Sequence, residues 1–221
     1  MCGRFSFAPD LRIVNEHFSI QVDPEIFKPR FNCAPTQNLA VITNEEPGIM
    51  NFFRWGLIPF WTKDMSIGNK MINARAETLL EKPSFKNAFS KRRCLVPADS
   101  FYEWRQTKPK VPYRIKLKDA ALFSMAGLWE TWKNPEGGVI NSFTIVTTTP
   151  NRLMSEIHNR MPVILSKESE KLWLDDLPPD DLYGLLSSYP DEFMEAWEIS
   201  PLVNSVYNEG NQLWDRPNRL F

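Results

Sequence analysis

The chain has 221 residues, of which 43% are hydrophobic and 24% charged, a composition typical of a globular protein with one sizeable core. No apolar run approaches the length of a membrane span, no signal peptide is evident, and the three cysteines contain no CxxC pair. These features exclude a membrane protein and a disulfide framework, and they suit a reducing cytoplasm. We therefore expect a cytoplasmic monomer with a single domain over residues 1–221.

Charge is sorted along a chain whose formal net charge is only −1. Segment 104–118 holds six cations and no acid, whereas segment 166–200 holds ten acids and two lysines. Such sorting lets a nearly neutral protein carry a basic face that attracts nucleic acid. The alternative is a pair of solvated surfaces of opposite sign.

Hydrophobic periodicity predicts mostly short elements, in keeping with the eighteen prolines. Helices are predicted at 11–18, 78–90 (interrupted by Pro83), 150–157, 166–174 and 180–188. Strands are predicted at 39–43, 49–53, 94–97, 101–104, 113–117, 122–126, 128–132, 139–148 and 193–199, with a hairpin loop at 134–138. Because strands do not alternate regularly with long helices, the pattern favours a mixed, strand-rich α+β domain over a doubly wound parallel sheet.

Cys2 directly follows the initiator methionine, and a small residue at this position permits cleavage of Met1 from the chain. Removal would leave an α-amine and a thiol on one residue. Such a 1,2-aminothiol condenses with an aldehyde into a five-membered thiazolidine, whereas a retained Met1 would block the reaction by acylating the amine. The alternative is a buried, inert cysteine in a short N-terminal strand.

Polar residues interrupt two apolar, strand-like runs. Asn73 and Arg75 lie in MINARAET, and Glu103 lies between Tyr102 and Trp104. A carboxylate among aromatic side chains has its ionised form disfavoured, which suits general acid–base work. The alternative places Glu103 on the solvent-exposed face of an edge strand.

Only two histidines occur, and their settings differ. His17 lies on the first predicted helix and is expected to be structural or exposed, whereas His158 lies in the polar sequence IHNRMP and suits proton transfer. The cysteines and histidines lack zinc-ligand spacings, and no phosphate-binding glycine loop or GxSxG occurs, so no metal or cofactor is expected. No protease signature surrounds Cys33 or Cys94.

The sequence RWGLIPFW carries three aromatic residues in a stretch broken by Gly and Pro. They are Trp55, Phe60 and Trp61. Exposed aromatic rings beside Arg and Lys hold unstacked bases in nucleic-acid-binding proteins. The alternative is that each ring is part of the core.

Seven sequence pieces occur in a specific order, and together they resemble the SOS response-associated peptidase (SRAP) family of abasic-site processing proteins. The resemblance covers residue 1 to about residue 210. The pieces are MCGRF (1–5), FNCAPTQ (31–37), RWGLIPFW (54–61), INARAET (72–78), RRCLVPADSFYEW (92–104), FTIVTT (143–148) and IHNRMPVIL (157–165).

The resemblance implies an α+β fold with a β-barrel-like core, flanking short helices and a positively charged groove for single-stranded DNA. It also implies that the processed N-terminal cysteine captures the ring-opened aldehyde of an abasic site. The product is a thiazolidine DNA–protein crosslink, formed by a lyase-like activity that shields the lesion and requires no cofactor.

The same resemblance assigns roles to residues that match the motifs. Cys2 is the expected nucleophile and Glu103 the general acid–base, while His158 lies by the sugar oxygens. Asn73 orients the N-terminal residue, and Arg75 contacts phosphate. Three further positions match DNA-contacting residues: Arg4, Trp61 and Arg160.

Two other functions remain open from the sequence. The family name contains a peptidase activity, whose narrow form is a self-cleavage that exposes Cys2. The basic segment and the tryptophans also suit a non-enzymatic module that binds single-stranded DNA without using Cys2.

Overall fold

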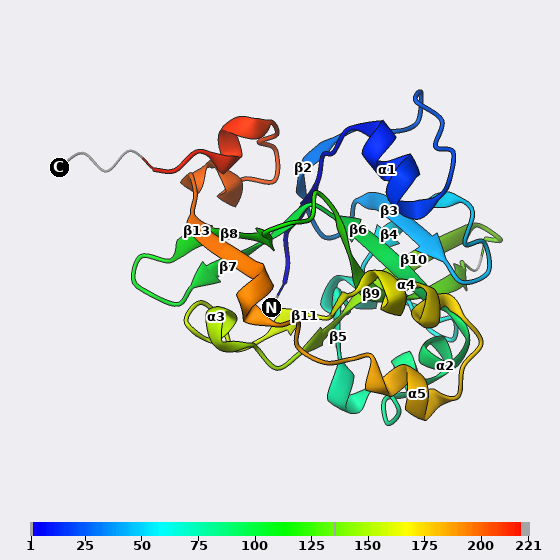
Figure 1. Ribbon diagram of the computed structural model, residues 1–221. Helices are drawn as coiled ribbons and strands as arrows, with labels where there is room; N and C mark the ends of the chain where they lie inside the picture. Colours follow the sequence, from blue (N-terminus) through cyan, green and yellow to red (C-terminus); the bar gives the residue numbers. More distant parts are fainter. Residues whose placement is uncertain (1, 135, 218–221) are drawn as a thin grey trace.

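A closed five-stranded barrel lies at the centre of the computed structural model, which describes residues 2–134 and 136–217 (Figure 1). The strand order is β10-β4-β3-β6-β9, and β9 pairs back with β10 to close the barrel. Only the β10–β4 pair within this ring is parallel. The five strands are β3 (Asn38–Thr43), β4 (Met50–Trp55), β6 (Arg93–Ala98), β9 (Phe123–Lys133) and β10 (Val139–Thr148).

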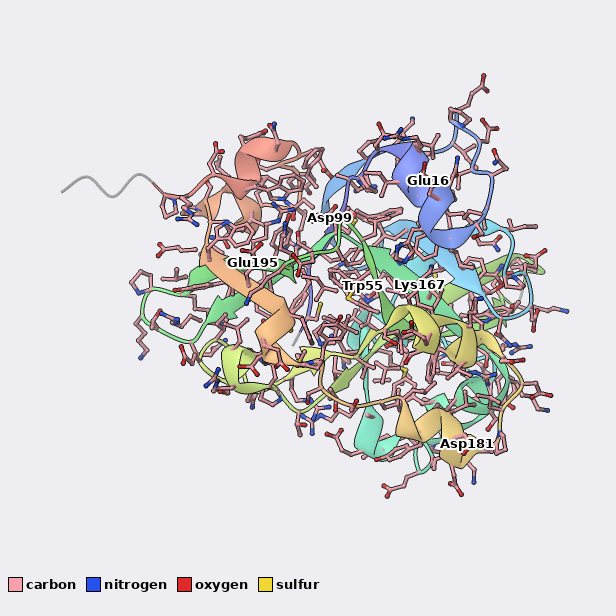
Figure 2. The ribbon with its side chains drawn as sticks, in the orientation of Figure 1. Glu16, Trp55, Asp99, Lys167, Asp181 and Glu195 are labelled. Atoms are coloured by element: carbon pink, nitrogen blue, oxygen red, sulfur yellow. The ribbon has the colours of Figure 1, made fainter. Side chains whose placement is uncertain are left out.

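Short strands and helices extend and cover the barrel. The edge strands are β5 (Asn73–Arg75), β11 (Met161–Pro162) and β12 (Ile164–Leu165), and the helices on this side are α2 (Pro83–Lys91), α4 (Lys167–Leu174) and α5 (Pro179–Gly184). Trp55 is fully buried and stacks on Phe143, and Figure 2 shows it near the middle of the molecule. Trp55 is therefore a core residue, as one of the two interpretations of RWGLIPFW requires.

A second, five-stranded sheet packs beside the barrel in the order β13-β8-β7-β1-β2. Its strands are β1 (Phe5–Phe7), β2 (Arg30–Cys33), β7 (Ser100–Arg105), β8 (Val111–Leu117) and β13 (Met194–Glu198). The remaining helices are α1 (Leu11–Phe18), α3 (Arg152–Ser155) and five 3-10 turns at Met65–Lys70, Ala76–Thr78, Asp191–Phe193, Pro201–Asn204 and Asn211–Trp214. This sheet carries the N-terminal segment.

The predicted class, a strand-rich α+β fold with a barrel-like core and short helices, is confirmed. Several predicted boundaries differ from the structure by a few residues, and two predicted elements are wrong. Pro83 begins α2 instead of interrupting a helix, because the first helical position needs no backbone N–H. The runs at 122–126 and 128–132 form one strand, β9.

The extent of the domain stays a prediction, and Pro135 in the predicted hairpin loop lies outside the described residues. Within the described chain, no helix has the length and apolarity to cross a membrane.

His17 is structural, as expected. Its Nε2 lies 3.0 Å from Oε1 of the buried Glu170, whose carboxylate also accepts hydrogen bonds from Ser124 and Lys167. These hydrogen bonds outweigh burial and hold the pKa of Glu170 below its usual value. The cluster connects α1 to α4 and β9.

Gly127 allows β9 to pass closely between its barrel neighbours. A Cβ at this position would lie 2.7 Å from Cys94 Sγ and 2.9 Å from Val96 Cγ2. We expect Gly127→Ala to lower the free energy of unfolding by about 1–3 kcal/mol in denaturant titrations, because the added carbon overpacks the barrel. Gly48→Ala is the matched control, since a Cβ there meets nothing within 4 Å. An equal loss in both variants would contradict the packing argument.

The basic segment meets the end of the acidic segment in the second sheet. Strand β8 pairs antiparallel with β13, and Lys116 lies 3.5 Å from Glu195, which Figure 2 labels. Arg114 is paired with Asp99. Pairing between these strands therefore neutralises part of the charge where the two segments meet. The cations near the turn after β7 remain close to the site described below.

Candidate functional site

A cavity of about 1120 Å³ opens between the end of β7 and the turn that follows α3. Glu103 lines it from β7 and His158 lines it from the α3 turn. Figure 1 shows these two elements on the same side of the molecule, with the start of the chain nearby. The complete lining is Glu103, Trp104, Arg105, Gln106, Thr107, Lys110, Ser155, Glu156, Ile157, His158, Asn159 and Asn204.

Sheet register brings Cys2 beside Glu103. In the β1–β7 pair, Phe5 lies opposite Phe101, and the Tyr102 N–H donates to the Arg4 carbonyl at 2.9 Å. Because paired antiparallel strands run in opposite directions, extending this register brings residues 2–3 alongside residues 103–104. Asn73 Nδ2 donates to the Cys2 carbonyl at 2.8 Å and so fixes the N-terminal segment from the barrel side.

The Cys2 thiol is fully buried, with Sγ 3.9 Å from the Arg4 carbonyl oxygen. Burial raises the thiol pKa well above its ordinary value, and the nearby Glu103 carboxylate raises it further. The thiol is therefore neutral at neutral pH. This state disfavours direct attack by a thiolate and suits a reaction in which another group attacks first.

Glu103 is buried, with 2% of its surface exposed, so its predicted position on a solvent-exposed strand face is wrong. The reason is topological: β7 is an inner strand with β1 on one side and β8 on the other, and both of its faces are covered. Phe101 and Tyr102, which precede Glu103, are fully buried as well. Glu103 is thus a buried carboxyl group that lines the cavity.

The ring of His158 is oriented by the backbone. His158 Nδ1 accepts a hydrogen bond from the backbone N–H of Arg160 at 3.0 Å. The backbone N–H of His158 donates to the Met154 carbonyl in α3. The neutral imidazole therefore carries its proton on Nε2. The α3 turn thus presents a histidine of defined tautomer to the cavity.

Asn73 and Arg75 share one face of β5. The strand pairs parallel with β10, where Asn73 lies opposite Ile145 and Arg75 opposite Thr147. Alternate residues of a strand point to one face, while the intervening Ala74 is buried on the other. Arg75 is exposed and lies two residues from the amide that holds Cys2. The two predicted residues are thereby close together.

Arg4 and Arg160 are engaged within the protein. Arg160 forms a two-pronged ion pair with Glu77 and donates to the Thr147 carbonyl at 2.6 Å, and this pair holds the pKa of Glu77 below its usual value. Arg4 Nη1 donates to Asn32 and to the Val203 carbonyl, both at 2.8 Å. DNA contact by either guanidinium stays a prediction.

Trp61 is half-exposed but lies away from the cavity. The loop that carries it is fixed where Trp132 Nε1 donates to the Thr62 carbonyl. Trp132 pairs with Ile140, five residues along β10 from the Asn73 pairing, which is about 17 Å at strand spacing. Trp61 is not among the residues that line the cavity, and its contact with DNA stays a prediction.

Asp99 is a structural partner of the site that the sequence interpretation missed. It accepts hydrogen bonds from Ser6 Oγ and from the Ala8 N–H at 2.6 Å, and it pairs with Arg114 at 3.2 Å. Asp99 lies between the predicted strands at 94–97 and 101–104, and an acidic residue in that position is the sequence signal that could have identified it. In the part of the chain that the structure describes, no three His, Cys, Asp or Glu side chains converge as a metal site.

The model of the SOS response associated peptidase (SRAP) family matches residues 1–206. The chain belongs to the SRAP family. SRAP relatives include the abasic site processing protein YoqW of Bacillus subtilis, 50% identical over 96% of this chain and 98% of YoqW. The abasic site processing protein HMCES of Xenopus tropicalis is 32% identical over 84% of this chain and 65% of HMCES.

The SRAP chain is also similar to a solved structure. A crystal structure of a Bacteroides thetaiotaomicron protein matches with a TM-score of 0.89 and 31% identity, covering 98% of this chain and all of that one. The resemblance that the sequence pieces indicated is therefore confirmed at the level of the family.

Proposed function

We propose that this protein processes abasic sites in single-stranded DNA by forming a thiazolidine crosslink through Cys2 after removal of Met1. One observation carries the proposal: Asn73 holds Cys2 beside Glu103, and Glu103 shares a cavity with His158. The printed names of the relatives, abasic site processing proteins, support the choice of lesion. Met1 lies outside the described residues.

The α-amine of Cys2 attacks first. An α-amine has a pKa of about 8, so part of it is neutral at neutral pH, whereas burial keeps the Cys2 thiol protonated. The amine adds to C1′ of the ring-opened sugar and gives a carbinolamine, which loses water to form an iminium ion. The thiol sulfur then adds to C1′ and releases its proton, so one water leaves and one thiazolidine forms.

Glu103 and His158 move the protons in this sequence. Glu103, beside Cys2, protonates the departing hydroxyl and accepts the thiol proton during ring closure. His158, with its Nε2 proton, hydrogen-bonds the sugar oxygens during ring opening. Asn73 fixes the Cys2 carbonyl and so restricts the amine and thiol to one geometry, which raises the effective concentration of the thiol.

Arg75 is an exposed cation two residues from Asn73 on β5, and Arg105 and Lys110 line the cavity. Phosphate contacts from such residues bind a strand without reading its sequence, and the affinity falls as salt rises. Arg4 and Arg160 keep their proposed DNA contacts only if the strand competes with Val203 and Glu77 for their guanidinium groups.

The test is incubation with a single-stranded oligonucleotide that carries one abasic site, followed by a denaturing gel. We expect a shifted band for wild type and none for Cys2→Ala. The alanine variant keeps the α-amine, so a borohydride-trapped imine should still form, and this control separates amine from thiol chemistry. A wild type that lacks Met1 and gives no shifted band would refute the proposal.

The two other functions give different results in the same assay. A non-enzymatic binding module would bind damaged and undamaged strands equally and give no covalent band. A self-processing peptidase would retain Met1 in the Glu103→Ala variant, which the intact mass of the purified variant reports.

A further inference from the structure

A second cavity, of about 390 Å³, lies between α2 and the end of β9. It is lined by Phe60, Asn87, Arg92, Thr131 and Lys133. Phe60 lies in the loop after β4, and Asn87 lies on α2. Arg92 follows the last residue of α2, and Thr131 and Lys133 lie at the end of β9. No residue of this lining also lines the cavity that contains Glu103 and His158, so the two cavities are separate.

The second cavity combines an exposed aromatic ring with an ion-paired arginine and an exposed lysine. Phe60 is 55% exposed, which is unusual for a phenylalanine inside a cavity. Arg92 is held in place by an ion pair with the buried Glu130 and lies 5.4 Å from the Trp129 ring centroid. Lys133 is exposed, and no carboxylate among the described residues pairs with it.

The surroundings of the second cavity are basic. Segment 82–93 contains five cations and no acid in a protein of net charge −1. Of the five, Arg93 is buried and bound to backbone carbonyls and Arg92 is paired with Glu130, whereas Lys82, Lys86 and Lys91 are exposed. A ring that stacks bases next to cations that bind phosphate is the arrangement that holds single-stranded nucleic acid.

We propose that this second cavity binds one nucleotide of the single-stranded DNA that carries the lesion, with the base on the Phe60 ring and the phosphate at Lys133. The inference rests on the proposed function for the identity of the strand. Thr131, which lines the second cavity, and Asn73, which holds Cys2, pair with positions of β10 that lie four residues apart, about 13 Å along the strand. The second cavity would anchor the strand without taking part in the chemistry.

The test is binding of undamaged single strands to Phe60→Ala/Lys133→Gln by fluorescence anisotropy at several salt concentrations. We expect an affinity about tenfold lower for a strand of about 16 nucleotides, because one base-stacking contact is lost. The slope of log affinity against log salt should fall by about 0.7, the value for one phosphate contact on a single strand. With a saturating abasic strand of about 4 nucleotides, which is too short to reach the second cavity, the double variant should form the crosslink at the wild-type rate.

Phe52→Ala/Lys28→Gln is the matched control, since it removes an exposed phenylalanine and an exposed lysine from a third cavity of about 180 Å³. Equal binding losses in the two double variants, or no loss in either, would overturn the inference. The anisotropy uses undamaged DNA, so it remains decisive even if wild type forms no crosslink. Absence of crosslinking would refute the proposed function alone.

Discussion

Replacing Glu103 by Gln should slow crosslink formation by about 10²-fold or more while leaving DNA affinity unchanged. Glutamine has the same shape as glutamate but cannot transfer the proton that the departing hydroxyl and the closing thiol require. Burial of Glu103 beside Cys2 leaves little room for water to take over this role. Single-turnover kinetics with an abasic oligonucleotide, quenched over time and resolved on denaturing gels, measures the rate.

Glu156→Gln is the matched control for this experiment. Glu156 lines the same cavity but is exposed, so it tests whether any loss of negative charge there changes the rate. We expect the control to react at the wild-type rate. Equal rates for the Glu103 and Glu156 variants would remove Glu103 from the proposed chemistry.

Replacing Asp99 by Ala should lower the free energy of unfolding by about 3–5 kcal/mol. The side chains of Asp99 and Arg114 are only 10% and 12% exposed, so the variant leaves a largely buried guanidinium without its carboxylate. It also removes the acceptor for Ser6 and for the Ala8 N–H. Denaturant unfolding followed by tryptophan fluorescence gives the value.

The network around Asp99 also fixes the position of β1, which leads directly from Cys2. Figure 2 labels Asp99 where the two sheets approach each other. Asp119→Ala, at an exposed turn, is the control and should change stability by less than about 0.5 kcal/mol. Restoring much of the lost stability with Asp99→Ala/Arg114→Met would support the buried-charge argument, whereas a loss equal to that of Asp119→Ala would refute it.

Hydrophobic patterns predicted those helices and strands whose pattern is complete within one short window of sequence. The strand-like runs at 39–43 and 139–148 and the helical spacing at 11–18 correspond to β3, β10 and α1. The short strand β5 was not predicted as an element because three residues carry no periodicity. It exists because β10 supplies a parallel partner, a long-range pairing that no window of sequence contains.

The site was predicted in its residue types but not in its environment. Asn73 binds the Cys2 carbonyl and Glu103 shares a cavity with His158, yet alternation alone could not establish that residues on both faces of β7 are buried. Likewise, nothing local indicates that Arg160 pairs with Glu77, which is 83 residues away along the chain. Long-range contacts decide which charged side chains are exposed and which are committed to partners.

The intact mass of the reacted protein tests the central claim most directly. After incubation with an abasic oligonucleotide, we expect one adduct whose mass is the sum of the protein without Met1 and the oligonucleotide, less one water. Peptide fragmentation should place the attachment on the amine and sulfur of Cys2. An adduct on any other residue, or an adduct on protein that retains Met1, would contradict the account.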